Sequence, residues 1–311
     1  MTHAFELRNV TKRFGKTSAL DNVSLAVPYQ SIVGLVGRNG SGKTSLLRHV
    51  TGLYLATEGD CITLGCSTPK LGAAELSQIG MVNQHDTFIE WMSVAQLIRY
   101  IGSFYPKWDR DLESQLIASL ELDQSARVGT LSPGNAQKLG LVLATCHHPA
   151  LLLLDEPLSD LDPIARATAV SMLLDRFSDD AITMVISSHM LHDIERIVDR
   201  VVFLDQGRIV RDSGLDELRE SYAEWIVSSP AGLLPERFND SFVLTQEGDR
   251  FQARLQVVDS PVVARGEFER TYGATLEIRP LSLDRIFPLV VGSKSRSTQF
   301  DRDVPAVGNT R

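Results

Sequence analysis

A glycine-rich segment that ends in Lys43 and Thr44 carries the clearest chemical pattern in the sequence. It meets the pattern G-x-x-x-x-G-K-[ST] at each fixed position. Its residues are Gly37, Arg38, Asn39, Gly40, Ser41, Gly42, Lys43 and Thr44. Glycines let backbone N–H groups wrap closely around phosphate, and the start of the following helix adds positive partial charge. The pattern predicts a nucleotide phosphate site, with Lys43 on the β- and γ-phosphates and Thr44 as a ligand of Mg²⁺.

A pair of carboxylates, Asp155 and Glu156, follows the apolar run at residues 151–154. Ligands collect at the carboxyl ends of strands in open α/β sheets. We therefore predict that Asp155 holds Mg²⁺, directly or through water, and that Glu156 polarises the attacking water. Alone, such a pair is often only a strand end, and its weight comes from the phosphate loop in the same chain.

The elements that position these residues follow from the hydropathy pattern. Continuous apolar runs are typical of parallel strands covered on both faces, and strands that alternate with helices predict an α/β fold. Residues 87–135, including a helical pattern that begins at Trp91, form an inserted helical lobe in which Trp91 is expected in the core. The predicted strands are 5–10, 20–27, 31–36, 151–154 and 183–186, and the predicted helices are 45–50, 111–120 and 134–148.

The sequence pattern changes after about residue 222, so we predict one domain over residues 1–221 and a second over 222–291. The second domain should contain antiparallel strands at 241–245, 251–257 and 275–278, then a helix at 283–290. One face of the middle strand should carry Phe251, Ala253, Leu255 and Val257. Residues 292–311 are polar and lack periodicity, and we expect them to be disordered.

Composition excludes several classes of protein. The chain has 311 residues and a formal net charge of −8, which argues against bulk nucleic acid as a partner. No apolar stretch approaches the roughly 18 residues of a membrane span, and no signal peptide is visible. The three cysteines cannot form a disulfide framework and are expected to be ordinary thiols in a reducing compartment. His147 and His148 are expected at a solvated helix end, not as metal ligands.

Further motifs stand in the order of one family, and over about residues 4–220 the chain resembles the nucleotide-binding subunit of ABC (ATP-binding cassette) transporters. Residues 131–135, Leu-Ser-Pro-Gly-Asn, resemble the signature motif, and residues 159–162, Ser-Asp-Leu-Asp, resemble the D-loop. Gln84 resembles the Q-loop glutamine, His189 the switch histidine, and Phe14 the aromatic residue that stacks on adenine.

The resemblance implies an α/β fold of the P-loop NTPase type: a mixed sheet, an antiparallel β-subdomain, the helical lobe and a small C-terminal α+β extension. It implies an ATPase that uses ATP and Mg²⁺. Gln84 would contact Mg²⁺ or the attacking water, and His189 would donate to the γ-phosphate or orient that water. Two subunits, identical or different, would close head-to-tail over two ATP. Ser132 and Gly134 of one would cover the phosphate held by the other, and Asp162 would also belong to the nucleotide site.

The signature departs from the usual Ser-Gly-Gly-Gln in this family. Pro133 has no N–H to donate to phosphate, and Asn135 is one methylene shorter than glutamine. We expect closure to be retained but weaker. The D-loop also departs from the family at Asp160, for which the sequence offers no role.

Residues 104–109 and 280–287 resemble the ATPases of ABC-2 type exporters. This resemblance implies a separate membrane permease and a place on the cytoplasmic face of the membrane. An aromatic surface after Gln84 is a candidate groove for a cytoplasmic helix of that permease, or else the core of the lobe; its residues are Phe88, Trp91, Tyr105 and Trp108. The alternatives are a soluble ABC ATPase and a weakly hydrolysing regulatory subunit.

Overall fold

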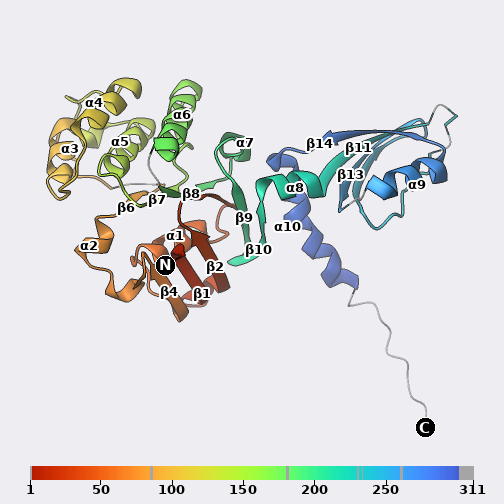
Figure 1. Ribbon diagram of the computed structural model, residues 1–311, viewed down its shortest axis with the longest axis horizontal. Coiled ribbons are helices and arrows are strands. Elements are labelled where there is room, and N and C mark those ends of the chain that lie inside the picture. The colour runs from red at the N-terminus through yellow and green to blue at the C-terminus, as the bar shows by residue number, and fades with distance from the viewer. Residues whose placement is uncertain are drawn as a thin grey trace, which may run out of the picture. The chain divides into compact units, whose positions relative to one another are not determined.

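The computed structural model describes residues 2–84, 87–179, 182–229, 231–232, 234–259 and 262–300. The chain forms two compact units, Met1–Asp212 and Ser213–Arg311 (Figure 1). The sequence placed the boundary after residue 221 instead. Helix α8 (Leu215–Ser221) therefore belongs to the second unit, where it leads directly into strand β11 (Tyr222–Ser228).

A six-stranded sheet in the order β10-β9-β3-β8-β7-β6 forms the centre of the first unit. The pairs among its last five strands are all parallel. Every residue of β3, β7 and β8 is buried, which confirms the three continuous apolar runs as core strands. The strands are β3 (Ile32–Val36), β6 (Ile79–Val82), β7 (Leu151–Asp155), β8 (Thr183–Ser188), β9 (Arg200–Asp205) and β10 (Arg208–Gly214).

The strand order brings the predicted chemical groups to one edge of this sheet. β8 lies between β3 and β7, and its end pairs Ser187 with Asp155 and Ser188 with Val36. The phosphate loop after β3, the carboxylates after β7 and His189 after β8 therefore emerge side by side.

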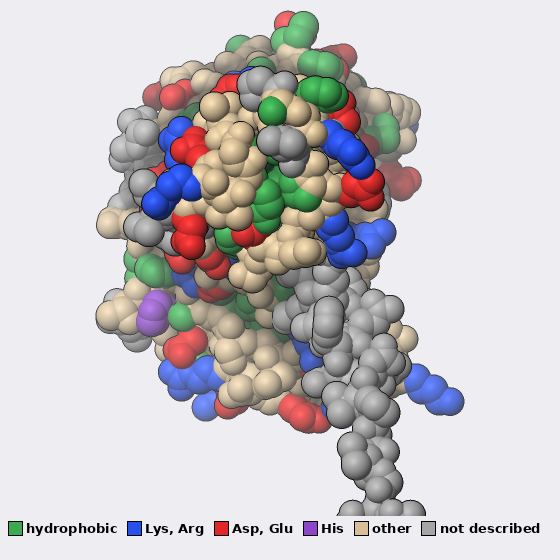
Figure 2. Space-filling model, turned by 90° about the vertical axis from the view of Figure 1, so that its right-hand side faces the viewer, with side chains coloured by type: hydrophobic (Ala, Val, Ile, Leu, Met, Phe, Trp, Pro, Cys, Tyr) green, Lys and Arg blue, Asp and Glu red, His purple; other side chains and the backbone are tan. Residues whose placement is uncertain are grey.

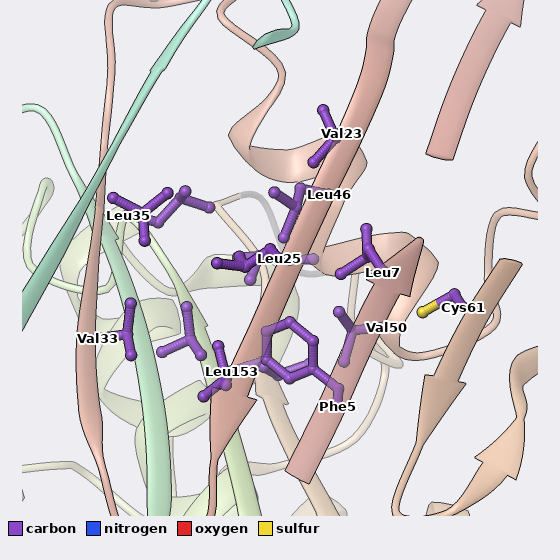
Figure 3. Packing of buried hydrophobic residues seen from close by; sticks show 14 of the residues in the cluster. Phe5, Leu7, Val23, Leu25, Val33, Leu35, Leu46, Val50, Cys61 and Leu153 are labelled. Atoms are coloured by element: carbon purple, nitrogen blue, oxygen red, sulfur yellow. The ribbon is translucent and has the colours of Figure 1, made fainter. Parts of the chain in front are cut away.

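An antiparallel sheet in the order β2-β1-β4-β5 makes the second layer of this unit. Helix α1 (Lys43–Val50) packs between the two sheets, and Figure 3 shows Leu46 and Val50 of α1 among Phe5, Leu35 and Leu153. This packing anchors the helix that follows the phosphate loop. The strands are β1 (His3–Phe14), β2 (Thr17–Pro28), β4 (Glu58–Thr63) and β5 (Cys66–Ser67).

The helical lobe contains α3 (Val94–Gly102), α4 (Arg110–Ser119) and α5 (Pro133–Thr145). Trp91 was expected in its core but is 70% exposed, because α3 begins only at Val94, after the capping residue Ser93. Trp108 packs instead against Gly102, where an added Cβ would lie 2.9 Å from the indole ring. The first unit is completed by η1 (Thr68–Lys70), α2 (Ala73–Leu76), η2 (Val128–Thr130), α6 (Pro163–Asp179) and α7 (Leu191–Ile194).

An antiparallel sheet in the order β12-β13-β11-β14 forms the second unit. Its apolar core includes Trp225 of β11, Leu255 of β13 and Phe268 of α9. Acidic and basic side chains are interspersed on the face shown in Figure 2. The elements after β11 are β12 (Val243–Gly248), β13 (Gln252–Val258), α9 (Val262–Tyr272), β14 (Thr275–Pro280) and α10 (Leu283–Phe300).

Two expectations for this unit are wrong. Phe251 is 61% exposed, because β13 begins at Gln252 and the Phe251 ring lies over Gly232 instead of on the buried face. Helix α10 runs to Phe300 and so includes residues 292–300 of the predicted disordered tail. A single glycine, Gly292, costs a helix only about 1 kcal/mol and does not end it. Residues 301–311 lie outside the described part of the chain.

The three cysteines are free thiols, as expected. Burial raises the pKa of Cys61 to about 11, so this thiol stays protonated at neutral pH. Among the described residues, no helix combines the length and apolar character needed to cross a membrane.

Candidate nucleotide-binding site

The phosphate loop joins β3 to α1, and its shape depends on glycine at two positions. Gly42 caps α1 with φ of 110°, a left-handed conformation that strains other residues. At Gly37 an added Cβ would lie 2.4 Å from the carbonyl oxygen of Leu204, so no larger residue fits. The loop therefore holds its backbone close to the edge of the sheet, as phosphate binding requires.

A cavity of about 420 Å³ opens beside this loop. Gln84, Asp155 and Glu156 line it together with residues 39–44 of the loop. The structure thus brings most of the predicted phosphate and metal residues to one place. Thr17, Ser18 and Ala19 at the start of β2 also line the cavity, and no sequence signal indicated them, because small residues in a hairpin carry no motif.

Lys43, Glu156 and His189 form a chain of contacts beside this cavity. The Lys43 Nζ donates to the carbonyl oxygen of Gly37 at 2.8 Å and lies 3.1 Å from Glu156 Oε1, close enough for an ion pair although the angles make no hydrogen bond. The other carboxylate oxygen, Oε2, lies 2.7 Å from His189 Nδ1. Lys43 and Glu156 are both buried, so each charge is compensated mainly by the other.

Asp155 has one oxygen in use and one without a partner. Its Oδ1 accepts a 2.7 Å hydrogen bond from Ser187 Oγ, whereas Oδ2 is buried and has no hydrogen-bond partner among the described residues. A buried carboxylate oxygen without a partner is costly unless a cation or water completes it. With Thr44 and Gln84 lining the same cavity, the donors are all oxygens, which suit Mg²⁺.

The backbone of Glu156 is held in a strained conformation. Its φ is 52°, in the left-handed region that non-glycine residues rarely adopt. Its N–H donates to Ser187 Oγ at 2.9 Å, and the same hydroxyl donates to Asp155. Ser187 therefore fixes the carboxylate of Asp155 and the backbone of Glu156 relative to β8. Ser187 carries no signal in the sequence, where it looks like an ordinary residue of a buried strand.

Ser132, Gly134 and Asp162 lie outside the phosphate cavity of their own chain. Ser132 caps α5, where its Oγ accepts the Asn135 N–H at 3.3 Å. The Asp162 side chain accepts from the N–H of Ile164 at 2.9 Å and of Ala165 at 3.0 Å at the start of α6. These backbone hydrogen bonds lower the pKa of Asp162, so its carboxylate serves as a helix cap.

Phe14 lies at the end of β1, at the turn before the cavity-lining residue Thr17. It is 46% exposed, and its ring meets that of Tyr54 edge-on with 5.3 Å between centroids. The ammonium of Lys12 lies 5.0 Å from the Phe14 centroid. Phe14 does not line the phosphate cavity, and Tyr54 and Lys12 are neighbours that no sequence motif indicated.

Comparison with known proteins identifies the family of this chain. A profile of the family described as "ABC transporter" matches residues 20–159. The ABC transporter ATP-binding protein YtrB of Bacillus subtilis is 33% identical over 217 residues, which cover 70% of this chain and 74% of YtrB. The chain belongs to the ABC transporter ATP-binding proteins. The methionine import ATP-binding protein MetN of Protochlamydia amoebophila is 31% identical over 231 residues, or 70% of this chain and 68% of MetN.

A solved ABC structure has the same fold as this ATP-binding protein. The dimeric structure of MJ0796, a bacterial ABC transporter cassette, matches with a TM-score of 0.61 and 25% identity, and covers 68% of this chain and 98% of that one. The expected α/β fold is confirmed, and with the family the chain is an ATP-binding ATPase.

One of the two histidines before Pro149 departs from its expected place in this ABC ATPase. His147 is buried, stacks on Tyr105 with 4.1 Å between ring centroids, and has its Nε2 3.3 Å from the carbonyl oxygen of Ile79. His148 contacts Asp109 at 2.9 Å. The expectation of a solvated helix end is wrong for His147, because α5 ends at Thr145 and the chain then packs against the lobe, whereas His148 is exposed as expected.

Proposed function

We propose that this ATPase binds ATP with Mg²⁺, hydrolyses it at the cavity beside the phosphate loop, and drives a separate membrane permease. The observation that carries the proposal is the convergence of Lys43, Glu156 and the unpartnered Asp155 oxygen at one cavity beside the phosphate loop. Glycine backbone, a buried lysine and two carboxylates at adjacent strand ends are the groups that phosphoryl transfer needs.

In the proposed reaction, residues 37–44 bind the phosphates and Lys43 moves from Glu156 to the β- and γ-phosphates. Asp155, Thr44 and Gln84 would hold Mg²⁺, which neutralises charge on the phosphates. Glu156, released from Lys43, accepts a proton from a water molecule. The oxygen of that water attacks the γ-phosphorus at the same time. The bond to the β-phosphate oxygen breaks, and ADP leaves with the electron pair. His189, whose Nδ1 lies within hydrogen-bond distance of Glu156 Oε2, orients the water or the γ-phosphate.

Phe14 is the proposed platform for adenine, because its ring is half-exposed next to the hairpin that lines the cavity. Ser132 and Gly134 stand at the N-terminus of α5 and outside the cavity of their own chain. We propose that they cover the γ-phosphate in a second subunit, in a head-to-tail dimer with two ATP. Asp162 would support this interface as the cap of α6. The dimeric cassette structure supports this proposal.

Pro133 occupies the first position of α5, where its missing N–H removes one donor to the partner's phosphate. This departure favours weaker closure than in a chain with Ser-Gly-Gly-Gln. It is also the observation that would favour a weakly hydrolysing regulatory subunit as a second function.

The proposed contact with the permease lies on the helical lobe. Trp91 and Phe104 are 70% and 63% exposed, and apolar surface of this kind marks partner sites. Tyr105 and Lys107, which follow Phe104 closely in the sequence, line a cavity of about 450 Å³. Phe88 is half-buried, and Trp108 packs within the lobe. Of the predicted aromatic surface, Trp91 and Tyr105 therefore remain as the candidates that a permease helix could contact.

Such a subunit would work at the cytoplasmic face of the membrane. The outward direction of transport rests on the resemblance of residues 104–109 and 280–287 to ABC-2 type exporters. A relative whose name denotes methionine import is 31% identical, so overall similarity does not fix the direction.

Capture of the partner tests this proposal. The tagged Glu156→Gln variant with ATP is incubated with membranes of its own host in mild detergent, and copurifying proteins are identified by mass spectrometry. We expect a multi-span membrane protein at near-stoichiometric yield, which Trp91→Ser should reduce. A soluble partner, or recovery of the chain alone from the cytosolic fraction, would favour the soluble ATPase or the regulatory subunit.

A further inference from the structure

Gln137, in the second turn of α5, makes contacts that reach the reaction centre. It is a polar residue that is only 6% exposed. Its Nε2 donates to the carbonyl oxygen of Glu156 at 2.7 Å, and its Oε1 accepts the N–H of Asp160 at 3.0 Å. One side chain therefore holds both ends of the turn that joins the catalytic carboxylate to the D-loop.

The turn is also held by other contacts from the same side. Ser159 Oγ donates to the Glu156 carbonyl oxygen at 3.0 Å and lies 3.4 Å from Gln137 Nε2. At Gly134 an added Cβ would lie 2.7 Å from the Asp160 carbonyl oxygen, so the start of α5 is pressed against the D-loop backbone. Asp160, for which the sequence offered no role, thus contributes its backbone N–H and C=O to this contact.

The Glu156 backbone is consequently fixed from two elements. Ser187 of β8 accepts its N–H, and Gln137 of α5 donates to its C=O. With φ of 52°, Glu156 occupies a conformation that persists only where its surroundings impose it. The direction of its carboxylate, and so its distance from the water that it must polarise, depends on that backbone conformation.

We propose that Gln137 is a positioning residue for hydrolysis: it sets the orientation of Glu156 and couples it to the signature end of α5. Gln137 does not line the phosphate cavity, so its loss should leave ATP binding intact and slow the chemical step. The proposal rests on the proposed role of Glu156 in hydrolysis; the contacts that it invokes lie within one chain, and it does not depend on a permease.

Two substitutions separate the amide's functions. Gln137→Met keeps the length and removes both hydrogen bonds. Gln137→Glu keeps an acceptor for the Asp160 N–H and replaces the donor to Glu156 with a carboxylate oxygen. Gln115→Met, on the exposed side of α4, is the matched control. Turnover is expressed per ATP-binding site. The number of sites is measured by titrating the protein with ATP in EDTA, where no hydrolysis occurs, so that misfolded protein that does not bind ATP is not counted.

We expect both Gln137 variants to lose at least about tenfold in kcat, with the ATP dissociation constant within about threefold of the parent. The Gln137→Glu deficit should shrink from pH 8 to pH 6, because a protonated carboxyl regains a donor and burial favours that form. The Gln137→Met deficit should not change with pH. A kcat per site within twofold of the parent, or a loss of ATP affinity equal to the loss of kcat, would overturn the proposal. So would a pH-independent deficit in Gln137→Glu.

Discussion

Lys43 and Glu156 contact each other in the cavity beside the phosphate loop, with 3.1 Å between the ammonium nitrogen and Oε1. Both side chains are more than nine-tenths buried, and His189 contacts the opposite carboxylate oxygen at 2.7 Å. The lysine expected on phosphate and the carboxylate expected on water thus neutralise each other in the described structure. In the proposed mechanism, phosphate entering this cavity would compete with Glu156 for Lys43 and leave the carboxylate free to accept a proton.

Lys43→Ala should abolish turnover and weaken ATP binding by at least about tenfold, because the only buried cation lining this part of the described cavity is lost. Breaking a buried pair should also destabilise the nucleotide-free protein by about 3 kcal/mol. Equilibrium ATP binding, steady-state hydrolysis and denaturant unfolding measure these effects.

Lys70 is an exposed lysine of η1, and Lys70→Ala is the control for that substitution. Its ATP affinity, turnover and stability should match those of the parent. Unchanged turnover in Lys43→Ala would refute the role of this lysine.

Pro133→Gly should raise turnover about two- to fivefold. The substitution restores an N–H at the first position of α5, where the proposed dimer needs donors to phosphate. Hydrolysis is measured at saturating ATP, together with the protein concentration that gives half-maximal rate. A lower rate would show that the proline is accommodated by another geometry, and Pro163→Gly at the start of α6 controls for loss of proline at a helix N-terminus.

The first unit should lose stability as pH falls below about 6.5. Burial lowers the pKa of His147, so the folded chain resists a proton that the unfolded chain accepts. Between the folded and unfolded pKa values the unfolded state binds more protons, and stability declines by up to about 1.4 kcal/mol per pH unit for one histidine.

Denaturant unfolding at pH 7.5, 6.5 and 5.5 measures this slope. His147→Phe keeps a ring against Tyr105 and should flatten it, whereas the exposed His192→Phe should not. Equal slopes in the parent and in His147→Phe would contradict the assignment. His49 has its pKa lowered by burial in the same direction, so some pH dependence should remain.

Arg285→Met should destabilise the second unit by about 1–2 kcal/mol. Arg285 of α10 donates to Glu224 of β11 at 2.6 Å, and its hydrogen bond lowers the pKa of that buried carboxyl. Losing the arginine leaves a buried charge, although Arg285 itself is half-exposed, which limits the effect. Thermal unfolding at pH 7 measures the loss.

The same pair gives an acid dependence. Because the folded pKa of Glu224 is depressed, the pair's stabilisation is present above the unfolded pKa of about 4.5 and is lost as pH falls through the lower folded value. Arg279→Met, which removes an exposed pair with Glu277, should have no measurable effect. Equal effects of the two substitutions would contradict the importance of burial.

The sequence predicted the elements whose residues carry strong local constraints. The short apolar run before Asp155 is typical of a covered strand, and residues 37–44 match the phosphate-loop pattern at each fixed position. These two facts place the phosphate cavity. Two predictions about burial failed for different reasons. Trp91 lies before the cap of α3 and so outside the helix that it was expected to join, whereas His147 is covered by Tyr105 from another loop.

The contacts that position Glu156 could not be predicted from the sequence, because they join residues of different elements. Gln137 and Ser187 read as ordinary residues of a helix and a strand, and their roles appear only when α5 and β8 meet the turn after β7. The boundary between the units was predicted nine residues too late, after residue 221. The helical pattern of α8 is equally compatible with the last helix of the first unit and with the first helix of the second.

The mass of Glu156→Gln with ATP and Mg²⁺, measured by size-exclusion chromatography with light scattering, tests the central claim most directly. The amide cannot accept the proton of the attacking water but fills the same space, so ATP should bind and persist. We predict a particle of twice the chain mass with ATP, a single chain with ADP, and a single chain in the Lys43→Ala/Glu156→Gln double variant. A single chain that has ATP bound, at concentrations where the parent hydrolyses it, would contradict the account.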